Sequence, residues 1–188
     1  SDLEQTGSTA DPLVRDPSRQ LLGADQEAWL VERLRESTAR WRIVGQQVMM
    51  APLKVVPGAE SQGGGVTLNP DQWDGYVAAR RRFFEAVRTE NPSNLVVLTG
   101  DIHTSWASEL TDDPNDPASY DPSTGRGAVG VEFVATSVTS PGIPGIDNAF
   151  VPTVKAVNPH IKWADLQHRG YLVVDVTAER TQGAWFHF

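Results

Sequence analysis

Two polar side chains follow an apolar run near the middle of the chain, and their types suit metal or acid–base chemistry. The apolar run covers residues 94–99, and Gly100-Asp101-Ile102-His103 follows it directly. In layered α/β proteins, ligands gather at the carboxyl ends of strands, and Gly100 permits a sharp turn there. In an extended conformation, Asp101 and His103 point the same way because they are two residues apart. A carboxylate and an imidazole in this position can hold a cation or act as an acid–base pair.

The same segment has a purely structural interpretation. An Asp after a strand often caps a turn, and a nearby His is commonly a hydrogen-bonded surface group. Two ligands also fall short of a metal site, because most sites need four or more donors. From this segment alone, the structural and functional interpretations carry equal weight.

The elements that would position this segment alternate between helices and strands. Apolar side chains at helical spacing predict two helices, and short apolar runs predict strands. The predicted helices cover residues 25–37 and 72–89, and the predicted strands cover residues 41–50, 94–99, 129–136, 170–177 and 183–188. The last two strands are separated by a short polar connection that is typical of a β-hairpin. Residues 51–71 and 111–128 are expected to be loops. This order predicts a mixed α/β layered sandwich.

Size and composition indicate one globular domain. The chain has 188 residues, of which 39% are hydrophobic and 21% charged, and this is an ordinary composition for a folded domain. We expect residues 1–20 to form a flexible lead-in and residues 21–188 to form the folded part. No apolar run is long enough for a transmembrane segment, and no signal peptide is recognisable. The absence of an initial Met suggests a processed, excised or truncated chain.

The charge balance and the lack of cysteine exclude several classes of function. The formal net charge is −8, which repels polyanions and argues against nucleic-acid binding. A small phosphate ester remains a suitable ligand, because a bound cation reverses the local field. The chain has no cysteine, so disulfides, zinc sites of the Cys type and thiol nucleophiles are excluded.

An ordered set of short motifs, spanning roughly residues 21–188, resembles one family. The motifs are Leu21-Leu22-Gly23 with Gln26 and Trp29-Leu30, Trp41 with Gln46-Gln47-Val48-Met49, Trp73-Asp74-Gly75-Tyr76 with Arg80, residues 98–106, Glu132-Phe133 with Thr136-Ser137, Asn158-Pro159-His160, and His168-Arg169-Gly170-Tyr171. Residues 100–103 are similar to the C-terminal metal motif of the calcineurin-like metallophosphoesterases, in its Gly-Asp-x-His variant. The whole set resembles the PhoD-type alkaline phosphatases and phosphodiesterases, a group that includes some phospholipase D enzymes.

The resemblance implies a fold and an activity. The fold would be the C-terminal portion of a four-layer α/β/β/α sandwich, with a mixed β-sheet and flanking helices. The activity would be metal-dependent hydrolysis of phosphate mono- or diesters by a secreted enzyme, using clustered metals such as iron with calcium. Asp101 and His103 would be ligands of different ions in the cluster. Such ions lower the pKa of bound water and neutralise charge on phosphoryl oxygens.

The resemblance also suggests weaker roles for three further residues. Gln47 stands where related enzymes place a metal-binding His, which would make it a polar group at or beside the metals. The favoured alternative is a buried amide with its hydrogen bonds satisfied. His168 and Arg169 could reach a phosphate, since Arg offers a bidentate fork to such oxygens. The favoured alternative is that they lock the strand that begins at Gly170.

Part of the family's ligand set does not occur in this chain. Such enzymes draw on an early Cys, an Asp with a nearby Tyr, and an Asp-Asp-His-Glu-like segment followed by an Asn. This chain has no Cys, and no Asp-Asp-His or Gly-Asn-His sequence precedes Gly100. We therefore expect an N-terminal fragment of the same enzyme as a partner that carries the remaining ligands. Without this N-terminal fragment, sheet edges and apolar surface of the chain would be exposed. A nicked enzyme, a truncated product and the last domain of a longer polypeptide explain the chain equally well. The alternative function is a non-catalytic interaction domain or an inactive fragment that retains the fold.

Overall fold

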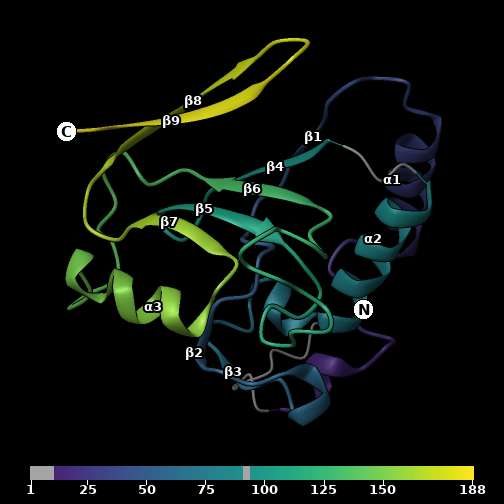
Figure 1. Ribbon diagram of the computed structural model, residues 1–188, viewed down its shortest axis with the longest axis horizontal. Helices are drawn as coiled ribbons and strands as arrows, with labels where there is room; N and C mark the ends of the chain where they lie inside the picture. The colour runs from purple at the N-terminus through teal and green to yellow at the C-terminus, as the bar shows by residue number, and fades with distance from the viewer. Residues whose placement is uncertain (1–10, 91–93) are drawn as a thin grey trace.

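A five-stranded mixed sheet forms the centre of the molecule (Figure 1). The computed structural model describes residues 11–90 and 94–188. The strand order is β1-β4-β6-β5-β7, with bounds Arg42–Gly45, Leu95–Thr99, Gly130–Val134, Ser105–Leu110 and Ile161–Asp165. Strands β1, β4 and β6 are parallel, and β5 is antiparallel to both β6 and β7. The carboxyl ends of β1, β4, β6 and β7 therefore lie at one edge of the sheet, where β5 begins.

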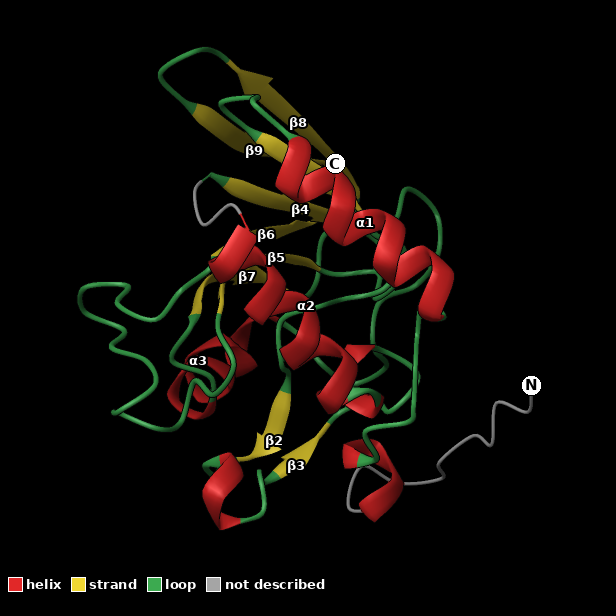
Figure 2. Cartoon of the chain, turned by 90° about the vertical axis from the view of Figure 1, so that its right-hand side faces the viewer, coloured by secondary structure: helices red, strands yellow, loops and turns green. Residues whose placement is uncertain are grey.

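Two small sheets and three helices surround this sheet. Strand β2 (Lys54–Val56) pairs with β3 (Val66–Thr67), and β8 (Gly170–Val176) forms a hairpin with β9 (Thr181–His187). The helices are α1 (Ala24–Glu36), α2 (Val77–Glu90) and α3 (Val151–Val157), with short 3-10 turns at Pro12–Arg15, Glu60–Gln62, Trp73–Gly75 and Asn148–Phe150. Figure 1 shows the hairpin on one side of the central sheet and α3 on the other, and Figure 2 shows α1 and α2 side by side. The predicted mixed sheet with flanking helices is confirmed.

The predicted elements with the clearest apolar patterns occur where they were expected. Strand β4 is an almost continuous apolar run because it is a central strand, and Leu95, Val96 and Val97 are at most 2% exposed. Helix α2 packs on the sheet through Phe83, Phe84 and other buried apolar side chains. The hairpin at the C-terminal end is confirmed as β8 and β9. Within the described ranges, no helix is long and apolar enough to cross a bilayer.

The strand predicted for residues 41–50 is wrong in its second half, because β1 ends at Gly45. The backbone N–H groups of Met50 and Ala51 donate to the carboxylate of Glu132, at 2.8 Å each, instead of to a neighbouring strand. A buried carboxylate satisfies the two N–H groups, so the chain can leave the sheet without losing their hydrogen bonds. The helix predicted from residue 72 starts at Val77, after a 3-10 turn. Strands β5 and β7 had not been predicted.

Other buried polar side chains hold the segment that follows β1. Asp74 accepts from the backbone N–H of Leu53 at 2.9 Å and from the guanidinium of Arg80 at 2.7 Å. Asn158 accepts from the N–H of Lys54, and a ring nitrogen of His160 lies 2.9 Å from the carbonyl oxygen of Pro52. These motif residues therefore shape the loop between β1 and β2.

The first half of the predicted flexible lead-in, residues 1–10, lies outside the described residues. Its second half is packed against the domain. Val14 is 1% exposed, and the Arg15 guanidinium contacts the Glu60 carboxylate at 3.2 Å. The Arg19 side chain donates to the carbonyl oxygen of Gly75 at 3.1 Å.

Candidate functional site

The five predicted site residues all follow strands that end at the same edge of the central sheet. Gln47 follows β1, Asp101 and His103 follow β4, and His168 and Arg169 follow β7. Backbone hydrogen bonds continue just past the strand ends, from Gln46 to Leu98 at 2.9 Å and from Ala135 to Thr99 at 2.8 Å. The topology therefore brings these residues to one edge, as expected for a ligand site in an α/β sheet.

Asp101 and His103 are not extended, so the predicted reason for their common direction is wrong. Their φ angles are 72° and 61°, which is the left-handed region. Residues 100–104 form this bend because the chain must pass the end of β6 to reach β5. A non-glycine residue in this region costs on the order of 1–3 kcal/mol, and such residues cluster at functional sites. Asn94 is the one other described residue of this kind.

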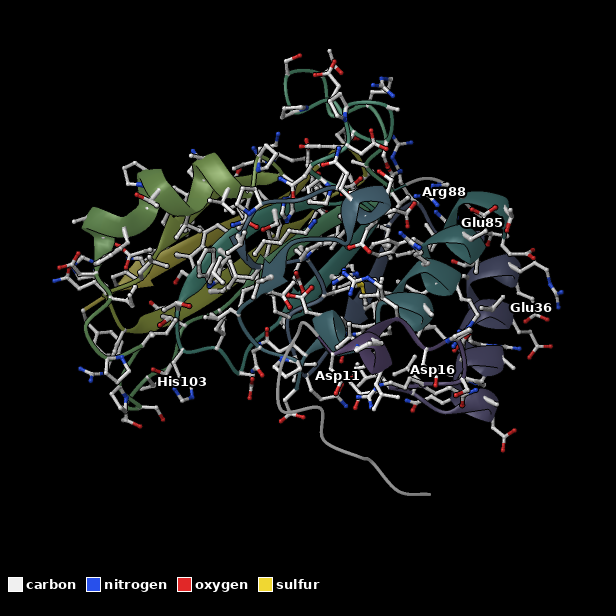
Figure 3. The ribbon with its side chains drawn as sticks, turned by 90° about the horizontal axis from the view of Figure 1, so that it is seen from below. Asp11, Asp16, Glu36, Glu85, Arg88 and His103 are labelled. Carbon is white, nitrogen blue, oxygen red and sulfur yellow. The ribbon has the colours of Figure 1, made fainter. Side chains whose placement is uncertain are left out.

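The His103 ring has a defined orientation although its side chain is exposed (Figure 3). Its Nδ1 lies 3.0 Å from the carbonyl oxygen of Pro141. A carbonyl oxygen only accepts, so Nδ1 carries a proton, and in the neutral ring Nε2 then has the lone pair. Metal-binding histidines commonly show this arrangement, in which one ring nitrogen donates to a backbone carbonyl and the other is a ligand.

The loop after β6 joins the His103 turn to the His168 turn. The Thr136 hydroxyl lies 3.1 Å from the carbonyl oxygen of His103 and 3.0 Å from that of His168. In the same loop, the carbonyl oxygen of Ser140 accepts from Nε of Arg169 at 3.1 Å. This Arg169 contact fits the interpretation in which the side chain locks the strand that begins at Gly170.

Asp165, at the end of β7, organises the turn that carries His168. Its Oδ1 accepts from the backbone N–H groups of Gln167 and His168, at 3.0 and 2.8 Å, and its Oδ2 accepts from Nδ1 of His168 at 2.8 Å and from the Asn148 amide at 3.0 Å. Burial raises the pKa of this carboxyl group, but the hydrogen bonds outweigh burial and hold the pKa well below its usual value. Asp165 is therefore a carboxylate at neutral pH.

His187, near the end of β9, completes a group that the sequence analysis missed. Its Nδ1 lies 3.9 Å from Oδ2 of Asp165, and its Nε2 lies 3.3 Å from the Ser105 hydroxyl. One potential ligand atom each from Asp165, His168 and His187 lie within 4.8 Å of one another. No local pattern in the sequence links these residues, because β9 reaches the group only by folding back.

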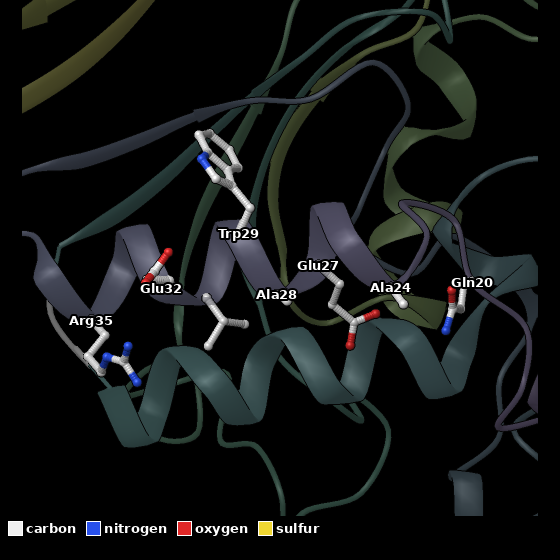
Figure 4. A pocket seen from close by; sticks show the side chains of 8 residues that line it. Gln20, Ala24, Glu27, Ala28, Trp29, Glu32 and Arg35 are labelled. Atoms are coloured by element: carbon white, nitrogen blue, oxygen red, sulfur yellow. The ribbon is translucent and has the colours of Figure 1, made fainter.

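Gln47 is exposed, so the favoured alternative of a buried amide is wrong. It lines a pocket of about 120 Å³ together with Trp29, Val44 and Trp73, among other residues. A broader hollow of about 700 Å³ lies along α1 (Figure 4). None of the predicted site residues lines that hollow, so it is not part of the candidate site.

Comparisons with known proteins agree on one family. The family model for PhoD-like phosphatases matches residues 2–185. Over 163 residues the chain is 38% identical to alkaline phosphatase D of Bacillus subtilis (strain 168), which is 87% of this chain and 26% of that protein. A solved structure of PhoD matches with a TM-score of 0.73 and 38% identity, over 89% of this chain and 30% of the other. The chain thus spans about a quarter of the length of the curated relative that it matches.

Proposed function

Because the chain belongs to the family of PhoD-like phosphatases, we propose that it supplies the C-terminal part of the active site of a metal-dependent phosphoric ester hydrolase. The observation that carries this proposal is the bend at residues 100–104. It presents two left-handed residues, Asp101 and His103, on either side of Ile102 at the carboxyl edge of the sheet.

The residues of this bend suit a metal cluster. Asp101 offers an exposed carboxylate, and the hydrogen bond between His103 and Pro141 leaves Nε2 of the ring as a ligand. In the proposal each residue holds a different ion, with iron and calcium as the expected metals. When bound, the ions would make hydroxide available near neutral pH and neutralise charge on the phosphoryl oxygens.

The other residues at this edge would orient the bend and the substrate. Thr136 ties the backbone of His103 to that of His168, so the two turns are held at a fixed spacing. His168 would use Nε2 toward a phosphate oxygen, because its Nδ1 is engaged with Asp165. Arg169 would add positive charge, and Gln47 would contribute its exposed amide beside the end of β4.

An N-terminal region of the same enzyme would provide the remaining ligands. The proposal is supported by the short span of the match, which is 26% of the curated relative. It is also supported by apolar side chains on one face of the hairpin, where Tyr171, Val173 and Phe186 are 46–51% exposed. Phosphate mono- and diesters, phospholipids among them, are the expected substrates. Secretion stays a prediction.

The test is the activity of this chain assembled with its N-terminal region in the presence of iron and calcium, on a chromogenic phosphodiester. We expect the single variants Asp101→Asn and His103→Asn to lower kcat/KM by more than about 100-fold, since even outer-shell partners of a metal are worth 10–100-fold. Asn tolerates the left-handed conformation, so these variants preserve the bend. Asp25→Asn, on the exposed surface of α1, is the matched control and should retain full activity.

If both bend variants hydrolyse the ester as fast as the control, the bend is not part of the active site. The second candidate, a non-catalytic interaction domain, is favoured by the exposed apolar face of the hairpin. Retained binding to the N-terminal region with no hydrolysis by the wild-type assembly would support that candidate instead.

A further inference from the structure

Asp165, His168 and His187 form a compact group of metal-binding side chain types that is distinct from the bend at residues 100–104. We propose that this triad binds one divalent cation of the zinc type, which fastens β9 to the end of β7. All three residues belong to this chain, so the site is complete without any other polypeptide. The proposal therefore holds or fails independently of the proposed hydrolase activity.

The position of the His187 ring supports a cation between it and Asp165. In a neutral ring whose Nε2 donates to the Ser105 hydroxyl, Nδ1 is an acceptor that lies 3.9 Å from the carboxylate Oδ2. Two acceptors this close repel, and a cation bound by both removes that repulsion. If instead Ser105 donates to Nε2, the Nδ1 proton is too far from Oδ2 for a hydrogen bond. In both cases His187 and Asp165 are near neighbours with no direct bond.

The spacing of the donor atoms matches a zinc-type ion. Bonds of about 2.0–2.2 Å that meet at a tetrahedral angle place the donor atoms about 3.4 Å apart. The measured distances from Oδ2 of Asp165 are 2.8 Å to Nδ1 of His168 and 3.9 Å to Nδ1 of His187. These values lie on either side of the ideal, and the remaining pair of ligand atoms lies within 4.8 Å, so modest side-chain shifts would form the site. On binding, Nδ1 of His168 would give up its proton, which moves to Nε2 in a neutral ring and goes to solvent from a doubly protonated ring.

The surroundings hold two of the donors in place. The Asn148 amide and two backbone N–H groups fix the carboxylate of Asp165, and the Trp163 ring stacks on His187 at 12°. Hydrogen bonds and packing of this kind orient the ligands in metal sites.

The donor set also selects the class of metal. One carboxylate and two imidazoles suit zinc and its neighbours in the first transition row, whereas calcium takes six to eight oxygen ligands. The His168 side chain is 48% exposed, so water can occupy the fourth position. The consequence would be a hairpin fixed at its base by an ion, in addition to the packing of its aromatic side chains.

The experiment is a titration of the metal-stripped chain with Co²⁺, followed by the visible d–d absorption of tetrahedral cobalt, with Zn²⁺ displacement measured by calorimetry. We expect the wild type to bind one such ion. His187→Phe keeps a ring against Trp163 but removes a donor, and it should weaken binding by more than about 100-fold. The double variant Asp101→Asn/His103→Asn should bind this ion like the wild type.

Circular dichroism of His187→Phe tests whether this variant is folded. If it is unfolded, His168→Phe removes a different donor and replaces it in the titration. Equal affinity of the wild type and both of these variants would overturn the proposal. So would loss of the ion in Asp101→Asn/His103→Asn, or a wild type without saturable cobalt or zinc binding. None of these measurements depends on phosphoesterase activity.

Discussion

His160 should make the stability of this protein depend strongly on pH. The side chain is fully buried, and its Nε2 donates to the carbonyl oxygen of Pro52. Burial lowers the pKa of His160 to about 3 from 6.5, with the nearby positive charges of Arg80 and Lys54 adding to the effect. Between these two values the unfolded chain binds the proton and the folded chain does not, so stability falls as the pH falls.

The size of the effect follows from the two pKa values. Each pH unit within this window is worth about 1.4 kcal/mol, so acidification from about pH 7 to about pH 4.5 should cost roughly 2.5 kcal/mol at this one site. His160→Gln places an amide nitrogen at about the reach of Nε2 and cannot titrate. It should lower the free energy of unfolding near pH 7 and remove this part of the pH dependence.

The assay is urea denaturation of the wild type and His160→Gln at several pH values, compared as the change in unfolding free energy with pH. Groups that titrate in both proteins cancel in the comparison. Gln62→Ala, which replaces an exposed side chain that does not titrate, is the control and should follow the wild-type curve. Parallel pH curves for the wild type and His160→Gln would refute the reasoning, because they would mean that His160 is protonated in the folded protein.

Two further predictions concern the hairpin and the loop after β6. Trp185→Ala should lower the free energy of unfolding by about 3 kcal/mol in chemical denaturation. The reason is that the ring contacts Phe133 and Trp163 and its N–H donates to the carbonyl oxygen of Val134 at 2.8 Å. A loss below about 1 kcal/mol would mean that the hairpin is not docked through this ring. Thr136→Val should lower hydrolysis by the assembled enzyme while costing only about 1 kcal/mol of stability, and unchanged kcat/KM would show that the hydroxyl does not position the two turns.

The corrections to the predicted site share one physical cause. The alternation of side chains along a strand holds only while the chain stays extended, and Asp101 and His103 leave that state because β6 lies between β4 and β5. Nothing within residues 94–106 specifies which strand will occupy that place. Likewise, the predicted strand does not continue to residue 50, because the backbone N–H groups of Met50 and Ala51 donate to Glu132, far along the sequence, and not to a neighbouring strand.

The sequence by itself determined the elements whose signals are local, and through ordered motifs it determined the family. Helical spacing in α1 and α2, the apolar run of β4 and the polar turn between β8 and β9 can be recognised within short windows. The tertiary structure alone decided which side chains meet at the carboxyl edge. Asp165, His168 and His187 come together because β9 folds back over β7, and such contacts depend on strand order and docking, which no short window of sequence encodes.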